Sequence, residues 1–206
     1  MIFLPREDCM TTTGNRPANT MRIKIGATAD GTLTAIEYES LGSTGAYRYN
    51  AGTATLPTYL YRCDNVRTVD TTVYTNAGKA RPMRAPGVPQ ADWALEQAMD
   101  ELAAALDLDP MAFRLQNIPT ELQNEARPPF TSTGLAACLT RGAEAFGWTP
   151  DAERGPGEGH LRRGVGFAAG GDVDVPLNGD PPSGYSVSLV LYLTAYDLGN
   201  RHGRDF

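Results

Sequence analysis

The sequence predicts an α+β fold, in which a mixed sheet containing a hairpin is packed by helices. Arg22 to Ala27 and Leu33 to Ser40 carry alternating apolar residues on either side of Asp30-Gly31, a pair that tolerates the positive φ angles of a tight hairpin turn. Val66 to Asn76 is rich in Val and Thr, which is typical of a strand. From Ala91 to Leu106, apolar residues recur mostly at three- and four-residue steps, which predicts a helix packed on that sheet.

This helix has a predicted buried stripe and a predicted solvent side. The stripe consists of Trp93, Leu95, Ala98, Met99, Leu102 and Leu106. The solvent side consists of Asp92, Glu96, Asp100 and Glu101. Carboxylates on successive turns of a helix far more often mark a solvated face than acid–base chemistry, so we assign them no catalytic role.

The other elements follow from turn and capping signals. Gly42 to Thr58 is rich in small residues and shows neither the three- to four-residue spacing of a helix nor the alternation of a strand. It is therefore predicted to be a long loop, either a pocket wall or an ordinary surface crossing. Asp109-Pro110 supplies an N-cap and a first-turn proline for a short helix. Thr131-Ser132-Thr133 can cap a third helix that ends at Gly147 and packs Cys138 on its apolar face.

Composition divides the chain into two units. Residues 1–150 hold the predicted sheet and helices, and residues 151–160 have the composition of a flexible linker. Residues 161–206 are then the start of a second α+β unit, with strands predicted at Gly164 to Ala169 and Tyr185 to Tyr196.

Charge and hydropathy exclude several classes of partner. The formal net charge is −6 and no basic cluster exceeds Arg162-Arg163, so no nucleic-acid partner is indicated. The longest apolar run, around Val187 to Ala195, is far shorter than the ~20 residues of a membrane-spanning helix. Residues 1–8 have neither the charged leader nor the apolar core of a signal peptide, so the expected compartment is the cytoplasm.

Histidine and cysteine chemistry is not indicated. His160 and His202 have no partner at metal-ligand spacing. Cys9, Cys63 and Cys138 are too widely spaced for a disulfide framework or a metal-ligand set. The thiols are therefore expected to be reduced and mostly packed, and no metal ligand is assigned.

One loop, just before the main helix, is the candidate binding site. Pro82, Pro86 and Pro89 restrict its backbone, Gly87 permits geometry that a side chain would block, and Arg84 projects among them. Helix amides and an arginine fork at one place suit a phosphate or an oxyanion. The residues alone leave a second interpretation open, a proline-rich turn whose arginine pairs with a nearby carboxylate.

The stretch MRAPGVPQADWALEQAMDELAAALDLDPMAFRLQNI resembles the molybdopterin-binding subunit of the xanthine dehydrogenase and aldehyde oxidase family. In that family an R-[AG]-x-G-x-x-Q loop precedes a helix ending in DELA and then DPxxxRxxN. The resemblance extends upstream through TGNRPANTMRIKIGATADGTLTAIEYESLGSTGAY and Tyr74-Thr75-Asn76, and downstream through Arg162 to Gly166. It covers most of residues 5 to 170.

The resemblance implies a molybdenum hydroxylase, whose molybdopterin cofactor oxidises an aldehyde or a carbon beside a heteroatom with oxygen from water. Electrons would leave through iron–sulfur and FAD subunits or domains. The resemblance places Arg84 beside the molybdenum centre, with Ala85 and Gly87 letting the backbone approach the cofactor. Pro86 stands where the family usually has an aromatic residue that packs on the substrate, which leaves the class of aldehyde or N-heterocycle open.

Two family segments have no counterpart in this sequence: the glycine-rich GGxFGxK segment and the glutamate base near the C-terminus. No catalytic residue is therefore assigned. The expectation is a partial molybdopterin-binding domain that forms one wall of the cofactor pocket and is inactive alone. The complete subunit would bind molybdopterin, and whether this fragment binds any is left open. The alternative is a stand-alone, non-catalytic binding or assembly module that keeps the scaffold.

Overall fold

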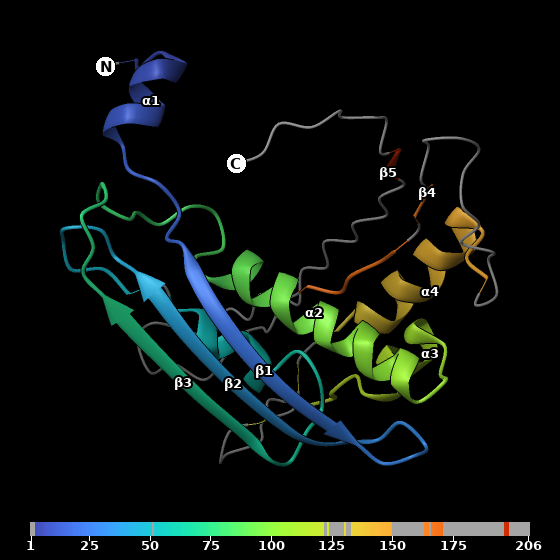
Figure 1. The fold of residues 1–206 in the computed structure, drawn as a ribbon. Helices are drawn as coiled ribbons and strands as arrows, with labels where there is room; N and C mark the ends of the chain where they lie inside the picture. Colours follow the sequence, from blue (N-terminus) through green and yellow to red (C-terminus); the bar gives the residue numbers. More distant parts are fainter. Residues whose placement is uncertain are drawn as a thin grey trace.

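The computed structural model describes residues 3–50, 52–121, 123, 130, 133–149, 163–164, 166–170 and 196–197. Its centre is a three-stranded sheet of β1 (Asn19–Ala27), β2 (Leu33–Ser43) and β3 (Val66–Val73), in that order. Helix α2 (Val88–Ala105) lies across one face of this sheet (Figure 1). The predicted α+β class, with a hairpin in a mixed sheet packed by helices, is confirmed.

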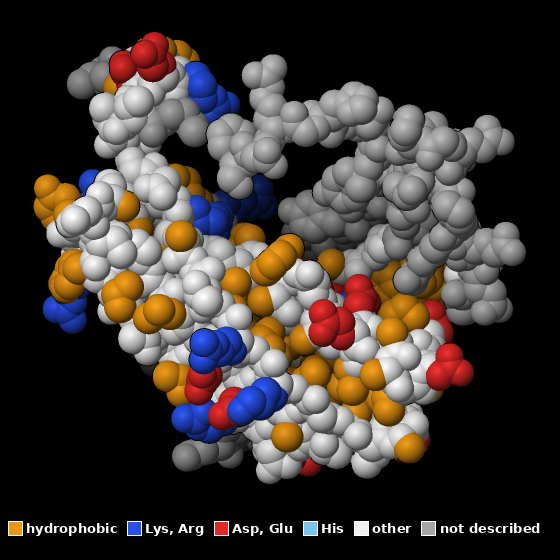
Figure 2. Space-filling view, in the orientation of Figure 1, with side chains coloured by type: hydrophobic (Ala, Val, Ile, Leu, Met, Phe, Trp, Pro, Cys, Tyr) orange, Lys and Arg blue, Asp and Glu red, His pale blue; other side chains and the backbone are white. Residues whose placement is uncertain are grey.

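The hairpin and the third strand pair as a mixed sheet. Strand β1 pairs antiparallel with β2, and β2 pairs parallel with β3. At the hairpin turn Gly31 has φ +88°, a left-handed conformation that glycine adopts without steric cost. Ile36 and Tyr38 on the inner face are buried, whereas the outer face carries charges from all three strands. Figure 2 shows basic and acidic side chains gathered together over the strands.

Helix α2 begins earlier than predicted, at Val88, and the predicted division of its faces is partly wrong. Its buried face consists of Ala91, Leu95, Glu96, Met99 and Ala103. Trp93 is 66% exposed because it lies two positions from Leu95, about 200° around the helix. Leu102 and Leu106 are only half-buried. Glu96 was predicted to face solvent and instead points inward, where it has buried partners described below.

The segment Gly42 to Thr58 is not the continuous loop that was predicted. Strand β2 continues to Ser43, and η1 (Thr53–Thr58) is a 3₁₀ helix on the same face of the sheet as α2. A short helix, α1 (Arg6–Thr12), precedes the sheet.

Two further helices follow α2. The predicted cap of α3 (Pro110–Gln116) is confirmed, because the Asp109 carboxylate accepts hydrogen bonds from the Met111 and Ala112 amides. Helix α4 (Leu135–Phe146) ends at Gly147 as predicted, but its N-cap is Gly134, without a side-chain hydrogen bond. Thr131 and Ser132 lie outside the described residues. Cys138 is exposed, so the prediction that it packs is wrong, whereas Cys63 is buried.

Of the predicted second unit, only short pieces are described. Strand β4 (Arg163–Gly164) pairs antiparallel with β5 (Tyr196–Asp197). Residues 166–170 have no regular secondary structure, so most of the strand expected from Gly164 to Ala169 is absent. The linker at 151–160, nearly all of the strand predicted from Tyr185, and both histidines lie outside the described residues.

Candidate functional site

The loop Arg81–Gly87 joins the sheet region to α2, and its first residues are held by two other segments. Ala80 forms a bridge with Asn15 and donates its amide to the Thr44 carbonyl at 3.0 Å. The Arg81 amide donates to the Asn15 carbonyl at 2.9 Å. The loop therefore starts from a point fixed by backbone hydrogen bonds on both sides.

Two glycines let these segments approach closely. A Cβ atom added at Gly45 would lie 2.0 Å from the Gly78 carbonyl oxygen, and one added at Gly14 would lie 2.4 Å from the Lys79 carbonyl oxygen. Both glycines also have positive φ angles, +71° and +89°. Any side chain at either position would displace the backbone that leads into the loop.

Near its end the loop has two residues with positive φ, one on each side of Pro86. Ala85 has φ +54° and Gly87, the N-cap of α2, has φ +82°. For a residue with a side chain, this left-handed region costs about 1–2 kcal/mol. The Val88 amide donates to the Ala85 carbonyl at 3.2 Å, and Pro89 has no amide hydrogen. The first turn of α2 therefore offers a ligand fewer amides than a helix N-terminus normally does.

The structure places the four residues of the predicted site together on this loop, with different exposures. Arg84 and Pro86 are exposed, Ala85 is half-buried and Gly87 is buried. Within the described part of the chain, the Arg84 guanidinium makes no ion pair or hydrogen bond. Among the described residues, no carboxylate pairs with Arg84.

Arg16, which the sequence analysis did not single out, holds the loop from outside. Its guanidinium donates to the Arg84 carbonyl at 2.8 Å, to the Ala85 carbonyl at 3.2 Å and to Gln90 Oε1 at 3.1 Å. The only signal for it in the sequence is its place in the TGNRPANT stretch that resembles the family.

A buried ion pair lies two turns further along α2. Glu96 accepts from Arg114 Nε at 2.8 Å, from the Tyr61 hydroxyl at 2.5 Å and from the Ala169 amide at 2.6 Å. Arg114 also donates to Asp100 at 2.7 Å. Burial raises the pKa of Glu96, and the Arg114 charge and these hydrogen bonds counteract that rise. All three partners are donors, which fits an ionised carboxylate.

This ion pair docks residues 166–170 onto α2 and α3. The Phe167 ring lies 4.7 Å from the Arg114 guanidinium and packs edge-on against Trp148 at 4.8 Å. Asp92 lies one turn before Glu96, and a Cβ atom at Gly170 would approach its Oδ2 to 2.9 Å. Burial, and then the nearby Glu96 charge, raise the pKa of Asp92 to about 8. Glu96 and Asp100 therefore have a structural role that the sequence analysis did not predict.

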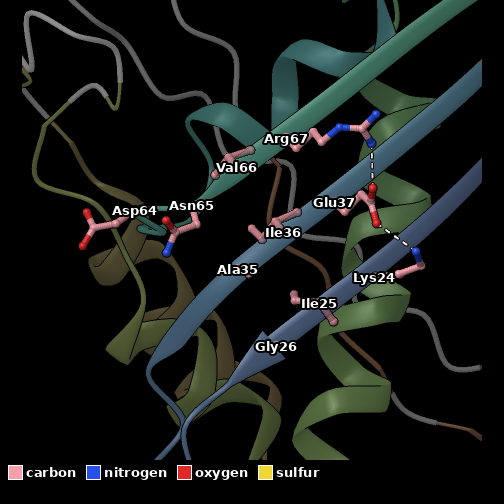
Figure 3. A pocket seen from close by; sticks show the side chains of 10 residues that line it. All are labelled: Lys24, Ile25, Gly26, Ala35, Ile36, Glu37, Asp64, Asn65, Val66 and Arg67. Carbon is pink, nitrogen blue, oxygen red and sulfur yellow. Dashed lines mark hydrogen bonds and ion pairs between the residues drawn. The ribbon is translucent and has the colours of Figure 1, made fainter.

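A shallow depression of about 690 Å³ lies on the outer face of the sheet. Figure 3 shows Lys24, Glu37 and Arg67 aligned across the three strands, with α2 behind them. Glu37 accepts from Lys24 at 2.9 Å and from Arg67 at 2.6 Å. Because these charges largely neutralise one another, the depression offers a ligand little unpaired charge.

The residues that the structure describes contain neither a metal-ligand group nor a membrane-spanning helix. No group of three or more histidine, cysteine or acidic side chains there is arranged to hold a metal ion. None of the described helices combines the length and the apolar character needed to cross a membrane.

Comparison with known proteins identifies the fold and the family. Residues 1–118 match the family model described as the molybdopterin cofactor-binding domain. The chain is 36% identical over 178 residues to the xanthine dehydrogenase molybdenum-binding subunit of Escherichia coli O157:H7, covering 81% of this chain and 23% of that protein. It is 33% identical over 177 residues to the aldehyde oxidoreductase molybdenum-binding subunit PaoC of Escherichia coli K12, covering 82% and 23%.

A solved structure agrees with these relatives. The aldehyde oxidoreductase from Desulfovibrio gigas superposes with a TM-score of 0.69 at 26% identity, covering 82% of this chain and 19% of that one. The chain thus spans less than a quarter of the length of each of these three proteins. The chain belongs to the molybdopterin cofactor-binding domain family, as a segment related to the molybdenum-binding subunits of xanthine dehydrogenase and aldehyde oxidoreductase.

Proposed function

We propose that this chain forms one wall of the molybdopterin pocket in the large subunit of a molybdenum hydroxylase, with the loop Arg81–Gly87 facing the cofactor. The observation that carries the proposal is the state of Arg84. Its guanidinium is exposed and makes no ion pair or hydrogen bond with the described residues, although the backbone beneath it is braced. Five N–H donors on a fixed backbone suit an anionic, oxygen-rich group.

The residues present fit such a group. Arg84 would donate charge-assisted hydrogen bonds to its oxygens, and lysine could not reproduce that planar fork. Gly87 carries no side chain and Ala85 only a methyl group, so both would let the cofactor approach the backbone. Pro86 is exposed beside Arg84 and would face the substrate.

When bound, the molybdenum cofactor would supply the oxidation of an aldehyde or an N-heterocyclic carbon, with oxygen from water. As the family resemblance implies, electron transfer would require iron–sulfur and FAD subunits or domains. The chain would contribute binding and orientation. Because no catalytic base is assigned to it, we expect the isolated chain to be inactive.

The test is cofactor retention. The full 206-residue chain would be produced in cells that make molybdopterin, and its molybdenum and pterin content would be measured after purification. We expect both in the wild-type chain, and a clear loss in Arg84→Lys at an unchanged melting temperature. Arg22→Lys is the matched control, because Arg22 is another exposed arginine, on the opposite side of β1 from its core-packed neighbours.

Two results would contradict the proposal. A folded chain without molybdenum or pterin would favour the non-catalytic binding or assembly module. If Arg84→Lys retains as much molybdenum and pterin as the wild type, Arg84 does not bind the cofactor. Turnover of an aldehyde or N-heterocycle by the chain alone, with an artificial electron acceptor, would show that the expected inactivity is wrong.

A further inference from the structure

We infer that Arg16 and Gln90 are positioning residues that set the conformation of the loop carrying Arg84. The inference rests on the proposed function of that loop and adds two residues to it. Neither would touch the cofactor: Arg16 would act through the backbone of Arg84 and Ala85, and Gln90 through Arg16.

Arg16 bonds to two consecutive carbonyl groups of the loop. Its Nη2 donates to the Arg84 carbonyl at 2.8 Å, and its Nη1 donates to the Ala85 carbonyl at 3.2 Å. One of these carbonyls belongs to Arg84 itself and the other to the next residue. The residues that make them are 68 and 69 positions apart in the sequence, so no local preference of the chain produces them.

Gln90 and Arg16 together form a brace between the loop and the segment that precedes β1. Its Oε1 accepts from Arg16 Nη1 at 3.1 Å, while its Nε2 donates to the Pro17 carbonyl at 3.3 Å and to Asn19 Oδ1 at 3.4 Å. One amide side chain thus ties the first turn of α2 to the segment from Arg16 to Asn19. It also fixes the orientation of the Arg16 guanidinium.

The brace explains how Ala85 keeps an unfavourable conformation. Non-glycine residues at positive φ persist only where their surroundings over-determine them. At Ala85, where φ is +54°, the carbonyl is held from two sides, by Arg16 and by the Val88 amide. Without Arg16 one of these constraints is lost, so Ala85 should relax toward ordinary φ values and turn Arg84 away.

Lysine at position 16 is the informative substitution. It keeps the positive charge, so long-range electrostatics at the site are nearly unchanged. A single ammonium group cannot match the fork that reaches two carbonyls and a side-chain amide at once. Arg16→Lys therefore separates the geometric role of Arg16 from its charge, and Gln90→Glu is avoided because it would add a charge.

The experiment uses the full 206-residue chain and two measurements. Amide hydrogen exchange reports the loop, and a titration with molybdate, followed by NMR of the Arg84 side chain, reports its availability to a tetrahedral oxyanion. For Arg16→Lys we expect exchange of the Val88 amide, which donates to the Ala85 carbonyl, to rise by about tenfold or more, as for loss of a charge-assisted hydrogen bond. Molybdate affinity should fall, while the melting temperature and exchange in β1 and β2 stay unchanged.

The controls separate this inference from the proposed function. If Arg16 acts through Arg84, the double variant Arg16→Lys/Arg84→Ala should bind molybdate no more weakly than Arg84→Ala alone. Unchanged loop exchange in Arg16→Lys, or faster exchange throughout the chain with a lower melting temperature, would overturn the positioning role. If the wild-type chain shows no molybdate-dependent NMR shift at Arg84, the oxyanion role of the loop is overturned. The positioning role of Arg16 would then be tested by amide exchange alone.

Discussion

Replacing Glu96 with Gln should destabilise the chain strongly, although the two side chains have the same shape. Arg114 is 0% exposed and Glu96 is 5% exposed, so the change leaves a buried guanidinium without its buried counter-ion. Breaking a buried ion pair in this way costs about 3–5 kcal/mol. Asp100 still pairs with Arg114 at 2.7 Å but is 50% exposed, so it compensates only in part. We therefore expect a loss of about 3 kcal/mol.

Urea denaturation followed by circular dichroism measures this loss. With a typical dependence of stability on urea, about 3 kcal/mol corresponds to a midpoint shift of about 1–3 M. The matched control is Asp100→Asn, which removes the other carboxylate bonded to Arg114. Because that carboxylate is half-exposed, we expect its removal to cost at most about 1 kcal/mol. Equal and small effects of the two substitutions would refute the reasoning, since they would mean that burial does not decide the strength of the pair.

Two further predictions concern α2. Because the pKa of Asp92 is raised to about 8 in the folded chain, the folded state holds a proton that the unfolded chain loses near its ordinary value of 3.8. Stability should therefore fall as pH rises from about 4 to about 8, and Asp92→Asn should flatten this fall in melts at several pH values. Leu95 is fully buried, so Leu95→Ala should cost about 2–5 kcal/mol. Trp93→Ala, at an exposed position, should change the unfolding free energy by about 0.5 kcal/mol or less.

The hairpin and helices α2, α3 and α4 could be predicted from sequence because their signals are local. Alternation in the two hairpin segments, the Asp30-Gly31 turn and the Asp109-Pro110 cap each involve neighbouring residues. The orientation of α2 could not be predicted in the same way. Its burial follows Leu95, Met99 and the small residues Ala91 and Ala103, and small residues contribute little to an apolar pattern.

The buried carboxylate was missed for a different reason. Acidic side chains are almost never fully buried unless they are paired. The partners of Glu96 are distant in the sequence: Tyr61 is 35 positions away, Arg114 is 18 away and Ala169 is 73 away. Arg16 was missed for the same reason, since its acceptors lie 68 to 74 positions away. The prolines and Gly87 mark the loop locally, but what holds it in place is not local.

The DPxxxRxxN stretch shows why family resemblance alone does not separate binding residues from structural ones. Asp109 caps α3, and Arg114 neutralises Glu96. Asn117 accepts from the Leu33 amide at 3.0 Å and donates to the Gly31 carbonyl at 2.9 Å, which ties α3 to the hairpin turn.

All three residues of that stretch are occupied within the fold, whereas the Arg84 guanidinium makes no such bond among the described residues. An arginine that satisfies its donors internally stabilises structure, and an exposed arginine on a braced loop keeps its donors available to a ligand. The loop that carries Arg84 leads into the start of α2, and Glu96 lies two turns after Val88 in the same helix. The buried bonds of Glu96 fix the rotation of α2, and this rotation sets the direction in which the loop meets the helix. The buried ion pair and the loop that we propose to face the cofactor therefore share one helix.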